Sequence, residues 1–427
     1  MKRPALASSQ RNQIDWFMQI TYTTWQLFIK NELQNHAAAT AFYFLLSAAP
    51  LVLLLTYATQ YLAHLAESSN LAGILLAALY ERFSLDELSQ LGFIPQKTQA
   101  AASGVGILTL LLSSRGLINA LQSAFRVIFP DEGKRLFVVN WVLPLLIVPL
   151  VFVLVILAIS LQAMLAFLLQ GDWLSVGKAR ALQSANVGFA LLALWGVIYL
   201  AYHRLPLTRP PKRTARLISA LSTLTLVGLF LGFGHFFHIE KYQAVYGALG
   251  GVVFVLIGAY LAAIAFYFWA QLLYALAKVD IAALEKLFLK QGEVHGSSRL
   301  ENLVFARANR LLSKYGRHFA AGEHLIREGD DSRDALFIHV GRVGIYKNLE
   351  QGEKKLAELE TGNLIGEMAY LLDETRTASV RAETEVVALV LPPNILEDLM
   401  RYSAPLSRRI ISNLAQRLMH MNRVTQT

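Results

Sequence analysis

Long stretches without charged residues dominate the first two thirds of the chain. Six of them contain no Asp, Glu, Lys or Arg, namely 33–66, 98–114, 136–171, 181–203, 217–239 and 242–277. A helix needs about 20 apolar residues to cross a bilayer, and five of the six stretches are long enough on their own. The shortest, 98–114, continues through Arg115 as far as Phe129, and we count it as the sixth span. The pattern therefore predicts a multi-pass α-helical membrane domain with about six spans.

The pattern changes near residue 278, where charges return and the apolar runs become short. From 317 to 392 these runs are broken by Gly or Asp, which is typical of the strands of an antiparallel roll or barrel. Helical patterns flank this region on both sides. We therefore predict a membrane domain at 1–280, a linker at 281–298, and a soluble, jelly-roll-like β-roll domain with flanking helices at 299–427.

Composition and charge support this division. Hydrophobic residues make up 55% of the 427 residues and charged residues only 16%, against about 25% in an ordinary soluble domain. Short loops rich in Lys and Arg stay in the cytoplasm, and the loop at 204–216 carries five basic residues. With six spans, both termini and the β-roll are then expected in the cytoplasm. Because the basic loops lie between spans, we expect them to meet lipid headgroups rather than nucleic acid.

Several kinds of chemistry are excluded or weakly supported. The chain has no cysteine, which excludes disulfides, thiolate catalysis and cysteine-ligated zinc. His235, His238 and Glu240 could hold a metal, but two histidines without a clear third ligand are more typical of interface residues. The predicted spans show no paired carboxylates and no nucleophile with a base. We therefore predict no metal site and no enzymatic activity. The basic N-terminus is not followed by an apolar core, so we also expect no cleaved signal peptide.

A polar stripe marks the second predicted span. Arg115, Asn119, Gln122 and Arg126 recur at spacings of four, three and four and would share one face of a helix. Such a stripe at membrane depth is costly unless it faces a protein interior or a water-filled cavity. One hypothesis is therefore that it lines a path for an ion or solute. The other is a helix lying partly in the membrane interface, with Arg126 reaching the headgroups.

The membrane part resembles a known family. The stretches "HAAATAFYFLLSAAPLVLLL" at 36–55, "YHRLPLTRPPKRTARLISAL" at 202–221 and "YQAVYGALGGVVFVLIGAYL" at 242–261 are similar to the YihY/BrkB family of bacterial inner-membrane proteins. The resemblance implies six helices and an inner-membrane location. It carries a supposed transport activity and an old ribonuclease label. Gln271 stands where the family tends to carry an acid. Metal-dependent RNA cleavage needs clustered acidic or histidine ligands, and neither half shows such a cluster.

The C-terminal part resembles the cyclic-nucleotide-binding domain family. The matching elements occur in the family's order: Phe319, Gly322–Glu323, Glu328–Gly329–Asp330, Gly341, Gly362, Gly366–Glu367 and "TRTASVRA" at 375–382. The last two form the family's phosphate-binding cassette. The resemblance implies that the domain binds cyclic AMP or cyclic GMP. The sequence does not distinguish the two bases.

The cassette also suits a cyclic nucleotide on chemical grounds. A short helix begins at the Gly–Glu pair, and the free N–H groups of a helix start attract an anion. Arg376 adds a planar, fork-shaped cation suited to a phosphate, and Glu367 would accept a hydrogen bond from a ribose hydroxyl. The predicted site comprises Gly366, Glu367, Met368, Ala369, Arg376, Thr377 and Ala378. Alternatively, the cassette is only a scaffold, with Glu367 paired to Arg376 or Arg381.

These observations lead to one main hypothesis and two alternatives. The main hypothesis is a transporter-like or channel-like inner-membrane protein regulated by a cytoplasmic cyclic nucleotide. The alternatives are a membrane sensor or scaffold that does not transport, and a membrane-tethered ribonuclease. The expected partners are the lipid bilayer and the nucleotide, and a homo-oligomer is compatible with the sequence. The chain ends soon after the last predicted helix, so we expect no DNA-binding helix-turn-helix.

Overall fold

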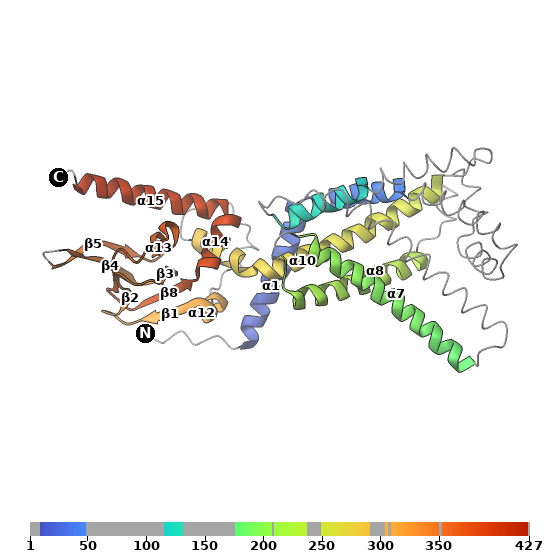
Figure 1. Ribbon diagram of the computed structural model, residues 1–427, viewed down its shortest axis with the longest axis horizontal. Coiled ribbons are helices and arrows are strands. Elements are labelled where there is room, and N and C mark those ends of the chain that lie inside the picture. The colour runs from blue at the N-terminus through green and yellow to red at the C-terminus, as the bar shows by residue number, and fades with distance from the viewer. Residues whose placement is uncertain are drawn as a thin grey trace. The chain divides into compact units, whose positions relative to one another are not determined.

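The computed structural model describes eight stretches of the chain, namely residues 9–47, 115–130, 176–206, 209–236, 249–290, 304–305, 309–349 and 352–425. The chain divides into two compact units (Figure 1). Unit 1 comprises Met1–Thr23 and Ala275–Thr427, and unit 2 comprises Thr24–Tyr274. The division passes through two helices, α1 (Ser9–Lys30) and α10 (Gly250–Lys290), so each of them has residues in both units.

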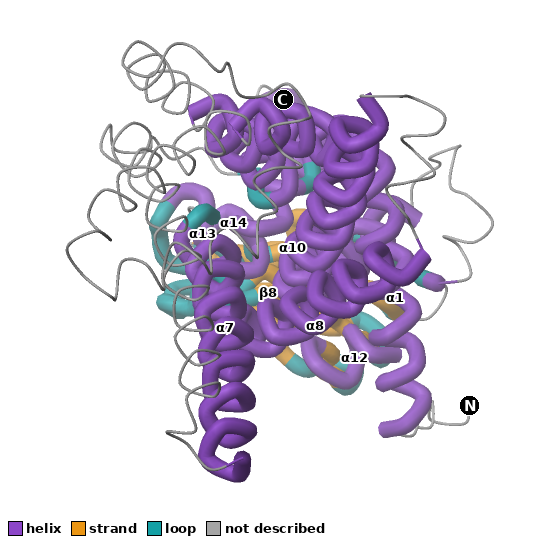
Figure 2. The backbone as a smooth tube through the Cα atoms, turned by 90° about the vertical axis from the view of Figure 1, so that its right-hand side faces the viewer, coloured by secondary structure: helices purple, strands orange, loops and turns teal. Residues whose placement is uncertain are grey.

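Unit 2 consists mainly of helices in the part that the structure describes (Figure 2). It contains helical segments at 33–47 and 115–128, the helices α7 (Val176–Arg204) and α8 (Lys212–Phe236), and the first part of α10. In α7, α8 and α10, the stretches Val187–Arg204, Lys212–Phe236 and Gly250–Leu289 are long and apolar enough to cross a membrane. The predicted span at 136–171 lies outside the described residues, and so do parts of others. The number of six spans therefore stays a prediction.

Polar side chains inside unit 2 pair between helices. The Tyr202 hydroxyl of α7 donates to the Phe266 carbonyl of α10 at 2.8 Å and lies 2.9 Å from the Ser222 hydroxyl of α8. The Tyr267 hydroxyl lies 2.6 Å from that of Thr40, in the segment 33–47. Both tyrosines are fully buried. Each of these bonds satisfies a polar group that would be costly to leave unpaired among apolar helices, and it thereby fixes neighbouring helices to one another.

A two-residue break separates α1 from the helical segment at 33–47. Glu32 has a positive φ of 49°, which ends the regular helix at this point. Asn31 donates a side-chain hydrogen bond to Gln271 of α10 at 3.1 Å. Gln271, the residue at the family's acidic position, is fully buried and accepts this bond as a neutral amide. The break is therefore tied to α10.

Unit 1 contains the predicted β-roll. Its eight strands are β1 (Gly316–Phe319), β2 (His324–Ile326), β3 (Ala335–Val340), β4 (Arg342–Leu349), β5 (Gly352–Glu360), β6 (Leu364–Ile365), β7 (Ser379–Ala382) and β8 (Val386–Leu391). They form two four-stranded sheets with the orders β1-β8-β3-β6 and β2-β7-β4-β5. All strand pairs are antiparallel. The structure thus confirms the predicted antiparallel roll.

Alternation along β3 explains how the roll is built. Leu336 and Ile338 point into the interior between the two sheets. Ala335 and Phe337 point to the other face of the same sheet, into a second apolar cluster. Because successive side chains of a strand face opposite sides, a strand with apolar residues on both faces needs cover on both. The second sheet covers one side of β3, and helices cover the other.

The covering helices come from before and after the strands. They are α12 (Asn309–Tyr315), α14 (Pro393–Tyr402), α15 (Ala404–Thr425) and the last part of α10, while α13 (Glu367–Leu372) follows β6. In α10, Ile281, Leu284 and Phe288 recur on one face and are buried in this cluster. The centres of the Phe288 and Phe337 rings are 4.0 Å apart. The predicted linker at 281–298 therefore begins inside a helix that is packed on the roll.

Candidate functional site

The turn between β6 and α13 requires glycine at position 366. Gly366 has a φ of 76°, a conformation that other residues adopt at a cost. A Cβ atom there would also lie 2.7 Å from Nη1 of Arg376 and 2.9 Å from Cδ1 of Ile326. The turn therefore brings its backbone against the arginine, and a side chain would push the two apart.

The Arg376 side chain is held by three acceptors from two segments, the loop before β3 and the turn at Gly366. Its Nε donates to the Ser332 hydroxyl at 3.1 Å, and its two terminal nitrogens donate at 2.6 Å to the carbonyls of Gly366 and Asp334. The side chain is only 4% exposed. A guanidinium has five N–H donors in a rigid fork. Three donate to these acceptors, and within the described part of the chain the other two are left pointing in a fixed direction.

The backbone of Arg376 is fixed as well. Its N–H donates to the Asp330 carbonyl at 3.0 Å, and its own carbonyl accepts from the N–H of Gly329 at 2.8 Å. These bonds tie the cassette loop to the turn before β3. Main chain and side chain are therefore both anchored to residues 329–334 before β3, and the side chain also to Gly366, which is how a site holds a cation ready for a ligand.

Burial and nearby carboxylates act in opposite directions on the pKa of Arg376. Burial lowers the pKa of its guanidinium, while the carboxylates of Asp334, Asp330 and Glu367 raise it. Arginine nevertheless stays protonated in proteins. The site therefore presents a poorly hydrated cation, which an anionic group with oxygen acceptors would stabilise.

The remaining predicted cassette residues lie at the start of α13 and directly after Arg376 in the chain. Glu367 and Ala369, in the first turn of α13, are 3% and 4% exposed, and Met368 between them is half-buried. Thr377 is exposed and Ala378 half-buried, just before β7. The first N–H groups of a helix have no partners within the helix. The chain thus brings helix-start N–H groups and the arginine to one turn of the roll.

Two residues that hold Arg376 were missed in the sequence. Ser332 and Asp334 lie in the polar stretch "GDDSRD" before β3, and they act through a hydroxyl and a main-chain carbonyl. Main-chain acceptors leave no signature in the residue type. Only the density of turn-forming residues there could have suggested a loop close to the site.

Arg381, an alternative partner of Glu367 in the scaffold hypothesis, has other contacts. Both carboxylate oxygens of Glu353 accept from its Nη2 at 2.8 Å. Its guanidinium also lies 4.6 Å from the centre of the Tyr346 ring. These residues come from β7, β5 and β4, which belong to the sheet β2-β7-β4-β5. Arg381 is thus engaged on the strands and not at the start of α13.

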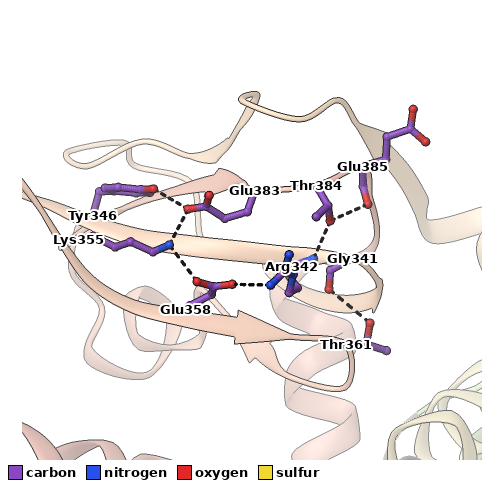
Figure 3. A network of polar contacts seen from close by, with 9 residues as sticks. All are labelled: Gly341, Arg342, Tyr346, Lys355, Glu358, Thr361, Glu383, Thr384 and Glu385. Carbon is purple, nitrogen blue, oxygen red and sulfur yellow. Dashed lines mark hydrogen bonds and ion pairs between the residues drawn. The ribbon is translucent and has the colours of Figure 1, made fainter.

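A chain of charged contacts continues across the same strands (Figure 3). Glu383 accepts from the Tyr346 hydroxyl and pairs with Lys355 at 2.9 Å. Glu358 then bridges Lys355 and Arg342, at 3.0 Å and 3.3 Å. The bond from Tyr346, and then Lys355, lowers the pKa of the Glu383 carboxyl. Exposed pairs of this kind contribute little to stability, and we assign them no ligand.

The predicted polar stripe of the membrane domain lies on the helical segment 115–128. Arg115, Asn119 and Arg126 are exposed, whereas Gln122 is 4% exposed. The structure therefore separates Gln122 from the other three by burial. Neither the path nor the interfacial alternative is decided by this placement.

Metal-ligand clusters are absent from the described residues, where no group of three or more His, Asp or Glu side chains is arranged to hold an ion. His235 lies in the last turn of α8. His238 and Glu240 lie outside the described residues.

Comparison with known proteins gives the chain two family matches. Residues 24–289 match the family described as "Virulence factor BrkB". Residues 316–403 match the cyclic nucleotide-binding domain. The second match contains every strand of the roll, α13 and the whole cassette.

Individual relatives match only a short part of the chain. The human cGMP-dependent protein kinase 2 is 33% identical over 90 residues, which are 21% of this chain and 11% of the kinase. Glutaminase 2 of Bradyrhizobium diazoefficiens is 36% identical over 99 residues, 23% of this chain and 15% of that protein. The crystal structure of the Thermus thermophilus catabolite activator protein is 25% identical, covers 32% of this chain and 60% of its own, and has a TM-score of 0.26.

The match to the first family covers well over half of the chain, including the three apolar helices α7, α8 and α10. It also agrees with the resemblance found in the sequence. The chain therefore belongs to the BrkB family, and it carries a cyclic nucleotide-binding domain after its membrane domain.

Proposed function

We propose that the protein binds a cyclic nucleotide at the turn formed by Gly366, α13 and Arg376, and that this binding regulates its membrane domain. The observation that carries the proposal is the anchored guanidinium of Arg376, which uses three of its five N–H groups on the protein. The remaining two can donate to the oxygens of a cyclic phosphate. Because the fork is held rigidly, little entropy is lost when the ligand binds.

The other cassette residues fit the remaining polar parts of such a ligand. Thr377 and Ala378 can donate a hydroxyl and main-chain N–H groups to the phosphate. Glu367 can accept from the ribose 2′-hydroxyl, which would explain a carboxylate placed beside a phosphate site. The base contacts stay open, so cyclic AMP and cyclic GMP are both candidates.

For the membrane domain we propose a transporter-like or channel-like activity in the bacterial inner membrane, with the nucleotide-binding domain in the cytoplasm. The membrane family and the three apolar helices support the location in a bilayer. The basic loop at 204–216 supports the orientation. We propose no catalytic reaction. A ligand shifts a second site by its difference in affinity for two states, typically by about 1–3 kcal/mol.

Calorimetry on the purified full chain tests the nucleotide site. We expect Arg376→Ala to weaken cyclic AMP or cyclic GMP binding at least about tenfold, because hydrogen bonds to charged groups contribute about 1.5–3 kcal/mol. Arg342→Ala is the matched control, since this arginine is exposed on β4 and pairs with Glu358. Arg376→Lys keeps the charge but not the fork and should also bind weakly. Equal affinities for the parent and both Arg376 variants would refute the site.

Reconstituted vesicles test the membrane activity. The proposal expects solute or ion flux that changes when nucleotide is added on the side of the β-roll. Nucleotide-dependent assembly without flux would favour the sensor or scaffold instead. Metal-dependent RNA cleavage by the pure protein would revive the nuclease. The Arg376→Ala variant should show flux that no longer responds to nucleotide.

A further inference from the structure

The exposed side of α1 is apolar, unlike that of an ordinary helix on a soluble protein. The stripe consists of Ile14, Phe17, Met18, Trp25 and Ile29, which are between 42% and 66% exposed. Their spacings of three, four and seven residues place them in one sector of the helix. Thr21 is exposed within the same sector, but an apolar surface of this extent marks a contact with something other than water.

The opposite side of the first half of α1 is polar and buried. Asp15, Gln19 and Thr23 are at most 7% exposed. Gln19 accepts a hydrogen bond from Nε of Arg310 at 3.1 Å and donates to the Val304 carbonyl at 3.4 Å. The polar side is therefore bonded to the part of unit 1 that precedes the roll. The apolar stripe, on the other side of the helix, is left exposed to an outside partner.

We propose that α1 lies in the interfacial layer of the bilayer, with the apolar stripe in lipid and the polar side holding the nucleotide-binding domain. The stripe carries Trp25, which is 59% exposed. Tryptophan is enriched where headgroups meet acyl chains. The helix itself is too polar to span, since the three candidate spans among the described residues do not include it.

Continuity with the membrane domain supports lipid as the occupant. The BrkB family match begins at residue 24, inside α1, so Trp25 and Ile29 already belong to that domain. The first predicted span starts at residue 33, directly after the break at Asn31 and Glu32. A helix that leads into a span within two residues must lie close to the membrane surface.

Charge favours the same partner. Lys30 is exposed at the end of α1, and the sequence places Lys2, Arg3 and Arg11 at or before its start. Basic residues at the ends of an interfacial helix attract anionic headgroups, while its apolar side enters the acyl boundary. The proposal does not depend on nucleotide binding.

Lipid quenching of single labels on the full chain tests the proposal. The natural chain has no cysteine, so Phe17→Cys and Ile14→Cys can each carry one fluorescent label. The protein is reconstituted in phosphatidylethanolamine and phosphatidylglycerol vesicles, with or without phosphatidylcholine brominated on its acyl chains. We expect both labels to lose about half of their fluorescence or more, because an interfacial helix buries its apolar face about 5–10 Å below the headgroups.

Two further positions set the scale. Phe230→Cys, on α8 within a candidate span and 76% exposed, gives the level for a label among lipid chains. Glu374→Cys, exposed on the cassette loop of the roll, gives the level for a label in water. Labels at positions 14 and 17 that are quenched no more than the one at 374 would overturn the proposal. Disulfide cross-links between copies through Phe17→Cys, without lipid quenching, would assign the stripe to a second copy of the chain and equally overturn it.

Discussion

Glycine at position 366 and arginine at position 376 depend on each other. The Gly366 carbonyl accepts from the guanidinium, and the missing side chain of Gly366 leaves room for it. The same turn also has a positive φ. Two separate constraints therefore act on one residue, and a matched pair of substitutions can separate them.

We expect Gly366→Ala to weaken nucleotide binding, because the new methyl group would displace Arg376. Gly322→Ala is the control, since Gly322 has a similar φ of 85° but nothing within 4 Å of its Cβ position. Both substitutions should lower stability by roughly 1–2 kcal/mol through the left-handed backbone. Only Gly366→Ala should also lower the affinity measured by calorimetry. An equal affinity for the two variants would show that the close approach to Arg376 does not matter.

At the scale of elements, Asp280 joins α10 to α12. Its carboxylate accepts from Arg310, from Lys314 at 2.5 Å and from the Tyr315 hydroxyl at 3.1 Å. The Arg310 side chain is only 12% exposed and also donates to Gln19 of α1. Asp280 and Arg310 therefore join α10, α12 and α1 in the unit that contains the roll.

We expect Asp280→Asn to loosen α12 by about 1–3 kcal/mol, because the buried Arg310 loses its charged acceptor. Hydrogen exchange should rise in Asn309–Tyr315 while nucleotide affinity stays close to that of the parent. Glu397→Gln is the control, since it removes an exposed i,i+4 pair with Arg401. Pairs of that kind contribute about 0.3–0.5 kcal/mol. Similar exchange in the two variants would contradict the role of Asp280.

Local sequence patterns predicted the strands and helices better than they predicted the contacts between these elements. The short apolar runs broken by Gly or Asp predicted the roll, because those signals act within a few residues. The cassette residues were also predicted, since their types recur at fixed spacing. The anchors of Arg376 were not predicted. The Asp334 anchor is a main-chain carbonyl, which can belong to any residue, and the Ser332 hydroxyl comes from 44 positions away in the sequence. The sequence also did not predict that α1 buries its polar side and exposes its apolar side. The partner of that polar side is about 285 positions away in the sequence.

At the scale of the whole molecule, α10 runs without interruption from the membrane domain into the core beside the roll. Inserting one alanine between Tyr274 and Ala275 would turn the two parts of the helix by about 100° relative to each other. We expect such a variant to keep nucleotide affinity but to lose the response of flux to nucleotide. A seven-residue helical insertion restores the phase to within about 20° and should recover part of the response. Calorimetry and vesicle flux on the three proteins measure both quantities, and an unchanged response after the single insertion would rule out α10 as the carrier.

Unit 1 combines two segments that are distant in the sequence, Met1–Thr23 and Ala275–Thr427, and this has a consequence for biosynthesis. Residues 9–23 leave the ribosome well before Val304 and Arg310, which Gln19 contacts, are made. At about 5–20 residues per second, the interval is on the order of tens of seconds. During that time the start of α1 lacks these bonds, so its apolar stripe is free to settle on the membrane before the nucleotide-binding domain exists. Translation order would then place the anchor first and let the finished domain assemble onto it.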